Sequence, residues 1–89
     1  MITRNEFKEL KADIKDGYYE LIDKYDEIND LQLNIYLEDE EVLIHIIDYG
    51  NNLEGGYGLS KDDVLNATYE RFNSMLNEVY YYNMYDIAE

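Results

Sequence analysis

The sequence contains no cysteine, which excludes disulfide bonds, a thiolate nucleophile and a cysteine-based zinc site. It also lacks a long apolar run, because stretches such as 42–47 are far shorter than the ~20 residues of a membrane-spanning helix. The first residues lack the apolar core of a signal peptide. These absences together lead us to expect a cytoplasmic protein.

Positive charge is scarce as well, with seven Lys and Arg against 21 Asp and Glu and a formal net charge of −14. Such an excess goes beyond what solubility requires, and its self-repulsion costs stability. Its field repels nucleic acids and anionic membranes and speeds encounter with a basic surface in a salt-dependent way. The composition therefore predicts a basic partner, and no direct binding to nucleic acid or membrane.

The 89 residues are enough for one domain with one modest core, so we expect a single acidic domain over residues 1–89. A first helix is predicted from Arg4 to about Asn29, because Thr3 and Glu6 form a capping box. Gly17 interrupts this segment and could instead end one helix and begin another. The apolar stripe that supports a continuous helix is Phe7, Leu10, Ile14, Leu21, Ile28 and Leu31.

Apolar and polar residues alternate over 31–37, which indicates a half-buried strand, and the apolar run 42–49 predicts a second strand. The four acids between them predict a turn, so the two strands form a hairpin. Residues 50–58 hold four of the five glycines and are interpreted as a loop.

A last helix is predicted from Ser60, with Asp63 at the capping-box position and an apolar stripe that continues to Val79. The predicted fold is α+β, in the order α-β-β-α, with two helices packed on one face of an antiparallel hairpin. Since two strands alone are marginally stable, a homodimer that extends the sheet is a further possibility.

No catalytic or metal site is predicted. His45 lies between Ile44 and Ile46 and is interpreted as a structural imidazole with apolar neighbours. Neither the neighbourhood of Gly17 nor that of Gly50 fits the register of a calcium-binding EF-hand loop. The glycine-rich segment lacks the lysine and the strand–loop–helix context of a phosphate loop. We therefore expect a binding protein that uses no cofactor, and not an enzyme.

The pattern of acids is more informative than their number. No Lys or Arg occurs from Tyr25 to Ser60, and acids recur along the predicted first helix at spacings of three and four, as one continuous edge. Four consecutive acids at a hairpin tip repel one another, which favours a functional reason for them over simple solubility. The predicted partner-binding acids are Glu38, Asp39, Glu40 and Glu41 at the tip, Asp48 and Glu54 at its rim, and Glu20, Asp23, Glu27 and Asp30 along the helix edge.

Tyrosine is the second unusual feature, with eleven tyrosines and no tryptophan. Tyrosine offers a large, rigid contact area with a polar tip, and beside a carboxylate it suits an arginine, which pairs with the acid and stacks on the ring. About half of the tyrosines are expected to seal a thin core instead. Tyr36, Tyr49 and Tyr57 are predicted to join the partner-binding acids.

The acidic segment 25–60, its tip and the interleaved tyrosines resemble those of phage-encoded DNA-mimic inhibitors, the anti-CRISPR and anti-restriction proteins. The resemblance is one of character and rests on no diagnostic motif. It implies that the protein occupies the basic DNA-binding site of a CRISPR effector or related nuclease in the bacterial host cytoplasm, with carboxylates in place of phosphates. Two alternatives remain: an immunity or antitoxin protein that neutralises a basic toxin, and a regulatory subunit that docks through the tyrosine-rich last helix.

Overall fold

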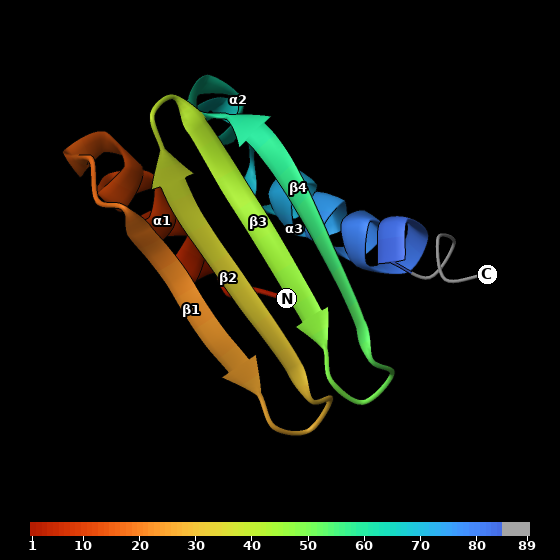
Figure 1. Ribbon diagram of the computed structural model, residues 1–89. Helices are drawn as coiled ribbons and strands as arrows, with labels where there is room; N and C mark the ends of the chain where they lie inside the picture. The colour runs from red at the N-terminus through yellow and green to blue at the C-terminus, as the bar shows by residue number, and fades with distance from the viewer. Residues whose placement is uncertain (85–89) are drawn as a thin grey trace.

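The computed structural model describes the backbone of residues 1–84 and side chains as far as residue 81. It confirms the α+β class, with a four-stranded antiparallel sheet in the order β1-β2-β3-β4 and all helices on one face of it (Figure 1). The predicted hairpin is thus the centre of a larger sheet. The elements are α1 (Arg4–Asp16), β1 (Glu20–Asp26), β2 (Leu31–Glu38), β3 (Glu41–Asp48), β4 (Leu53–Ser60), α2 (Lys61–Asn66), α3 (Tyr69–Glu78) and a π-helical turn η1 (Val79–Met84).

The first helix starts as predicted and ends much earlier. The Thr3 side chain accepts a hydrogen bond from the backbone N–H of Glu6, and the Glu6 carboxylate accepts one from the backbone N–H of Thr3, so the capping box is confirmed. The prediction of a continuous helix to Asn29 is wrong, because Gly17 has φ 79° and ends α1 with a left-handed cap. Only glycine adopts this conformation without steric cost. The chain then turns back as β1, which pairs with β2.

The predicted central hairpin is confirmed in detail. β2 pairs with β3 in a regular antiparallel register, from Leu31 opposite Asp48 to Glu38 opposite Glu41. The turn between them has Asp39 in the left-handed region, at φ 57°, a conformation that Asp tolerates better than most residues.

The prediction of a loop over 50–58 holds only for residues 50–52, which form a turn, since residues 53–60 form the edge strand β4, paired with β3. Glycine disfavours strands on propensity alone, so the sequence pattern concealed this strand. Its pairing with β3 overrides that preference. At Gly58 a side chain would collide with the carboxylate of Glu41, which lies over this position.

The last helix begins where predicted, because Ser60 accepts a hydrogen bond from the N–H of Asp63. It is not continuous, however. Ala67 and Thr68 have extended backbones, and Thr68 starts α3 by accepting a hydrogen bond from the N–H of Arg71. The break lets two short helices, α2 and α3, cover the sheet in place of one long helix.

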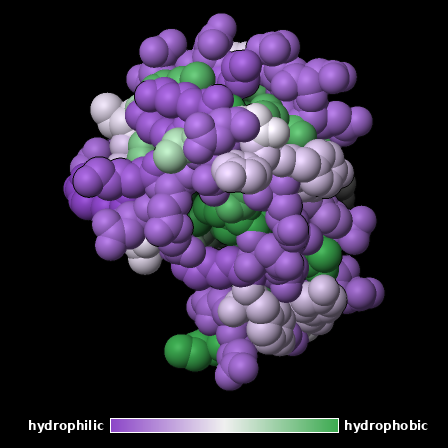
Figure 2. Space-filling view, turned by 90° about the vertical axis from the view of Figure 1, so that its left-hand side faces the viewer, coloured by the Kyte–Doolittle hydropathy of each residue, from purple (hydrophilic) through white to green (hydrophobic). Residues whose placement is uncertain are grey.

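The core lies between the sheet and the helices. Apolar side chains of α1, α2 and α3 pack against alternate residues of β2 and β3, as the pleat of a half-buried sheet requires. From the side of α1 and β1, hydrophilic residues cover most of the surface, and apolar residues are visible in a hollow near the centre of the view (Figure 2). The buried core consists of Ile2, Phe7, Leu10, Ile14, Leu33, Ile35, Val42, Ile44, Ile46, Val64, Phe72, Leu76 and Val79.

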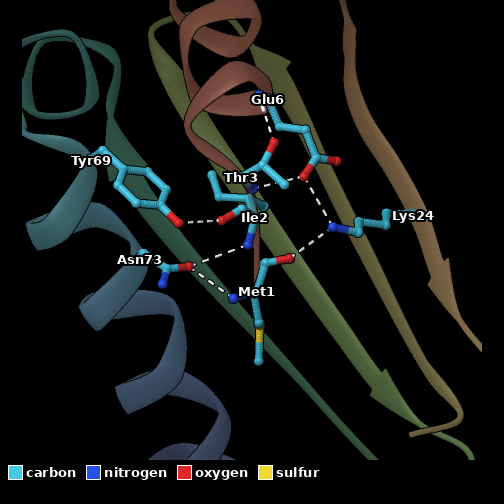
Figure 3. Close-up of polar contacts among 7 residues, drawn as sticks. All are labelled: Met1, Ile2, Thr3, Glu6, Lys24, Tyr69 and Asn73. Carbon is cyan, nitrogen blue, oxygen red and sulfur yellow. Dashed lines mark hydrogen bonds and ion pairs between the residues drawn. The ribbon is translucent and has the colours of Figure 1, made fainter. Parts of the chain in front are cut away.

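The N-terminal residues fasten α1 to α3 (Figure 3). The amino group of Met1 and the backbone N–H of Ile2 both donate to Asn73 Oδ1, at 2.8 and 3.2 Å. The Tyr69 hydroxyl donates to the carbonyl of Ile2 at 2.6 Å. These contacts link residues about seventy positions apart, so they hold the helical layer together as one unit.

The same cluster reaches the sheet through Lys24 of β1. Its ammonium group donates to the carbonyl of Met1 at 3.1 Å and pairs with Glu6 at 3.0 Å. Lys24 therefore points toward the helices and not toward the uncovered side of the sheet. Within residues 1–84, no helix is both long and apolar enough to cross a membrane.

Candidate functional site

One face of the sheet is uncovered by helices, and we call it the open face (Figure 1). Residues opposite one another in an antiparallel pair share a face, so the registers identify its side chains. None of them is Lys or Arg. The open face carries Glu20, Asp23, Tyr25, Gln32, Asn34, Tyr36, Glu38, Glu41, Leu43, His45, Ile47 and Glu54.

All seven cations of the chain lie in the helical layer or point into it. Four are on α1, one each on α2 and α3, and the seventh is Lys24, which contacts α1. Residues 20–60 contain eleven acids and one lysine, a formal charge of −10, whereas the three α-helices contain eight acids and six cations, a charge of −2. The sheet and its turns therefore hold most of the negative charge.

The four acids from Glu38 to Glu41 lie together at one end of the open face, as predicted, and all four are exposed. They line a shallow groove with Leu43 and Ser60. Lys61 Nζ lies 3.2 Å from a carboxylate oxygen of Glu40, and its backbone N–H donates to the Glu40 carbonyl at 2.8 Å. One tip carboxylate is thus partly neutralised, while the turn itself is anchored to the start of α2.

Glu20 and Asp23 are not on a helix edge, which corrects that prediction. They lie on β1, where the pairing with β2 shifts by one residue between Glu20 and Ile22. An extra residue in a strand inverts the alternation, so this β-bulge places both acids on the open face although they are three positions apart. Strict alternation would have put Asp23 against the helices.

Glu27 and Asp30 lie in the β1–β2 turn, at the far end of the sheet, and not on a helix. Hydrogen bonds within the turn hold its shape. Asp26 accepts hydrogen bonds from the backbone N–H of Ile28 at 3.0 Å and from the side chain of Asn29 at 2.9 Å. The bonds from the Asn29 side chain and backbone hold the pKa of Asp26 below its usual value.

The same turn fixes Tyr25, whose hydroxyl donates to the carboxylate of Asp30. This bond raises the pKa of the Tyr25 phenol above its ordinary value. At its tip, the turn presents Ile28 with 93% of its surface exposed. The heptad spacing that placed Ile28 in a helical stripe was therefore coincidental.

Asp48 is not a rim contact, and that prediction is wrong. Only 1% of its surface is exposed, since it points to the helical side at the end of β3. Its carboxylate accepts hydrogen bonds from the backbone N–H of Asn51 at 3.1 Å, the Asn51 side chain at 2.9 Å and the Tyr80 hydroxyl at 3.0 Å. Asp48 thus shapes the β3–β4 turn and binds it to η1, while Glu54 remains exposed on the open face.

Two pairs of tyrosines stand on the open face. The rings of Tyr19 and Tyr36 lie 5.6 Å apart between centroids, and those of Tyr25 and Tyr49 lie 6.2 Å apart in an edge-to-face arrangement. Tyr36 and Tyr49 therefore lie on the same face as several of the predicted partner-binding acids. Tyr19 and Tyr25 were absent from the predicted set, because their position depends on β1, which the sequence pattern assigned to a helix.

Tyr57 is on the opposite side, which corrects another predicted contact. It pairs with Ile44, a core residue, so its side chain lies on the helical face of β4. There it lines a groove with residues of α2 and α3 such as Val64 and Met75.

The tyrosines of the last helical segment have structural partners where side chains are described. Tyr69 bonds to Ile2 and packs against Phe7, and Tyr80 bonds to Asp48. Tyr81 is 60% exposed, and its ring contacts that of Tyr80. The side chains of Tyr82 and Tyr85 lie outside the described residues.

His45 lies on the open face, not among the apolar residues beside it in sequence. Ile44 and Ile46 point to the core, while His45 Nε2 is 3.7 Å from the carboxylate of Glu54. As far as residue 84, the structure brings together no group of three or more His, Asp or Glu side chains suited to hold a metal ion.

Comparison with known proteins gives no further guidance to function: no family model, no curated protein and no solved structure matches this chain. The geometry and charge of the open face are therefore the basis for a functional proposal.

Proposed function

We propose that this protein inhibits a bacterial CRISPR effector or a related defence nuclease by occupying its basic DNA-binding site as a nucleic-acid mimic. The open face is the contact surface. The acids from Glu38 to Glu41 enter deepest, and Glu20, Asp23 and Glu54 continue the negative charge along the sheet.

The observation that carries this proposal is the segregation of charge. Solubility alone does not require cations to be excluded from one face, because soluble surfaces ordinarily have charges of both signs interspersed. Here the open face has no Lys or Arg, and the cations are gathered in the helical layer. A single-sign surface steers association with a surface of opposite sign.

The dimensions agree with a short piece of DNA. Strands of eight residues extend roughly 27 Å at ~3.4 Å per residue. Along that length lie the exposed acids at both ends and Asp23 between them. The five acids on the open face amount to about one charge per 5 Å over this length, which is of the same order as the one charge per ~3.4 Å along a single DNA strand.

The test is competition for DNA. The purified protein is added to a candidate effector or nuclease captured from host lysate, and DNA binding is measured at increasing salt. We expect the protein to displace DNA at low salt and to lose this ability steeply as ionic strength rises. A variant with Glu38→Gln, Asp39→Asn, Glu40→Gln and Glu41→Gln is expected to lose inhibition by at least about tenfold.

The control removes the same charge from the helical layer, through Glu9→Gln, Asp13→Asn, Asp16→Asn and Glu78→Gln. This variant should inhibit nearly as well as the natural sequence. Equal loss in both variants would mean that total charge matters and not the open face. Capture of a basic toxin that has no DNA-binding activity would favour an immunity protein, and salt-independent capture would contradict both functions.

A further inference from the structure

The open face contains a concave site of about 450 Å³ between β1, β2 and β3, which we call the tyrosine hollow. Its lining includes three tyrosines, two carboxylates, two amides and three isoleucines. The aromatic and acidic members are Tyr19, Glu20, Asp23, Tyr36 and Tyr49.

The tyrosines that line the hollow are accessible to a ligand. Tyr19 is 64% exposed and Tyr49 is 54% exposed, although both have ring neighbours. Tyr19 is held against Tyr36 with an angle of 34° between the ring planes, and the Tyr19 carbonyl accepts a hydrogen bond from the N–H of Leu37 at 2.7 Å. The backbone at Tyr19 is thus hydrogen-bonded to β2, and the backbone N–H of Tyr49 donates to the carbonyl of Asp30 at 3.0 Å.

The carboxylates are placed in the hollow by the β-bulge of β1, which turns both Glu20 and Asp23 to this face. Bulges commonly re-aim side chains beside functional sites. Asp23 is also oriented, because the Gln32 side chain donates to it at 2.5 Å. Aromatic rings and two carboxylates, of which Asp23 is oriented by Gln32, therefore line one hollow.

This combination of rings and carboxylates favours an arginine side chain over a lysine side chain. A guanidinium is planar, weakly hydrated, stacks on aromatic rings and forms paired hydrogen bonds with a carboxylate. An ammonium is a compact, strongly hydrated charge with less to gain from several rings. We propose that the tyrosine hollow is an arginine-selective docking site, which receives one or more arginine side chains from the basic surface of the partner.

The proposal rests on the proposed function, because a DNA-binding partner supplies the basic surface. It adds that arginine side chains of the partner bind in the tyrosine hollow. The acids from Glu38 to Glu41 contribute electrostatic attraction that does not distinguish arginine from lysine. The two claims can fail separately, since arginine selectivity is measurable without any nuclease.

The probes are two end-blocked nine-residue peptides, one of arginine and one of lysine, titrated calorimetrically into the protein in 150 mM salt. We expect the arginine peptide to bind about tenfold more tightly, from several ring contacts. Tyr19→Leu with Tyr49→Leu should reduce this preference to about twofold, because the arginine peptide loses far more affinity than the lysine peptide.

A matched control is available in Tyr18→Leu, because Tyr18 is 59% exposed and does not line the hollow. This variant should keep the full preference for arginine. Thermal unfolding of each variant shows whether the fold is intact, and backbone NMR shifts with the arginine peptide should be largest at β1 and the Tyr36 region of β2.

Equal affinity for the two peptides, or shifts confined to residues 38–41, would overturn the arginine site. Loss of preference in the Tyr18→Leu control would overturn it as well. If the natural protein nevertheless displaces DNA from a nuclease, the proposed function stands without the arginine site. If arginine selectivity is found but no DNA is displaced, the site stands and the nuclease is the wrong partner.

Discussion

The two faces of the sheet differ in almost every physical respect. Between the helical face and the helices, thirteen apolar residues of the described part of the chain are buried, and hydrogen bonds join polar groups of distant segments there. The open face has exposed tyrosines and acids, an uncovered groove and hollow, and no Lys or Arg of its own, although Lys61 of α2 pairs with Glu40 at its edge. The contacts that stabilise the fold are therefore concentrated on the helical face. The open face is free to carry negative charge that does not contribute to stability.

The largest expected difference between the faces comes from two neighbouring residues of β3. Ile44 is 2% exposed, and Ile44→Ala should lower the free energy of unfolding by about 3 kcal/mol through lost burial and a cavity. Leu43 points to the open face, so Leu43→Ala should cost below about 1 kcal/mol. Urea unfolding of both variants measures the difference. Similar losses would indicate that the open face is covered in solution, for example by a second copy.

Asp48 and Glu54 provide the second comparison, between a buried and an exposed acid at the same end of the sheet. Asp48→Ala would leave the Asn51 N–H and the Tyr80 hydroxyl without this acceptor, so a loss of about 2 kcal/mol is expected. Glu54→Ala should change stability by below about 0.5 kcal/mol. The same urea titration tests both, and a neutral Asp48→Ala would refute the structural role given to this residue.

The third comparison concerns repulsion. The variant with four amides at positions 38–41 should be more stable than the natural sequence by about 0.5 kcal/mol at low salt, because like charges at one turn are removed. The effect should shrink as salt rises. The variant with four changes in the helices should gain less, since cations lie nearby. A destabilised tip variant would contradict this view and would also weaken any conclusion from its loss of inhibition.

An equally small effect is predicted for Glu6. Burial raises its pKa, but the hydrogen bonds from the Thr3 N–H and Lys24 outweigh this and hold the pKa below its ordinary value of 4.5. The stabilisation is therefore fully present above pH 4.5 and is lost as the pH falls through the lowered pKa. Glu6→Gln should cost about 0.5 kcal/mol at neutral pH, because solvent screens the pair with Lys24.

Stability measured against pH checks the last prediction. The difference between the natural protein and Glu6→Gln should disappear in acid, where Glu6 is protonated in both states. Glu20→Gln serves as the control on the open face and should show no loss at neutral pH. A constant difference at all pH values would assign the effect of Glu6 to helix capping and not to charge.

Several local features of the fold could be predicted because their signals are local. Thr3 with Glu6, and Ser60, start helices through hydrogen bonds to residues three positions away. The alternation along 31–37 and the acids at 38–41 identified the central hairpin and its turn. The features that could not be predicted depend on pairing between distant residues. β4 is rich in glycine and is a strand only because β3 lies beside it.

The candidate site shows the same division. The acids at the tip were placed correctly, because a turn between two strands is exposed wherever the strands pack. Asp48 and Tyr57 were misplaced, since the side of the sheet to which a residue points follows from register and from the position of the helices. Tyr19 and Tyr25 were missed because β1 was assigned to a helix.

The sequence by itself determined the negative charge, the number of tyrosines, the helix starts and the central hairpin. Each of these is a matter of composition or of contacts within a few residues. Only the tertiary structure decided that Gly17 ends α1, that a β-bulge turns Glu20 and Asp23 to the open face, and that all the cations belong to the helical side. The physical reason is that the face on which a charge lies depends on the pairing and packing of segments far apart in the chain.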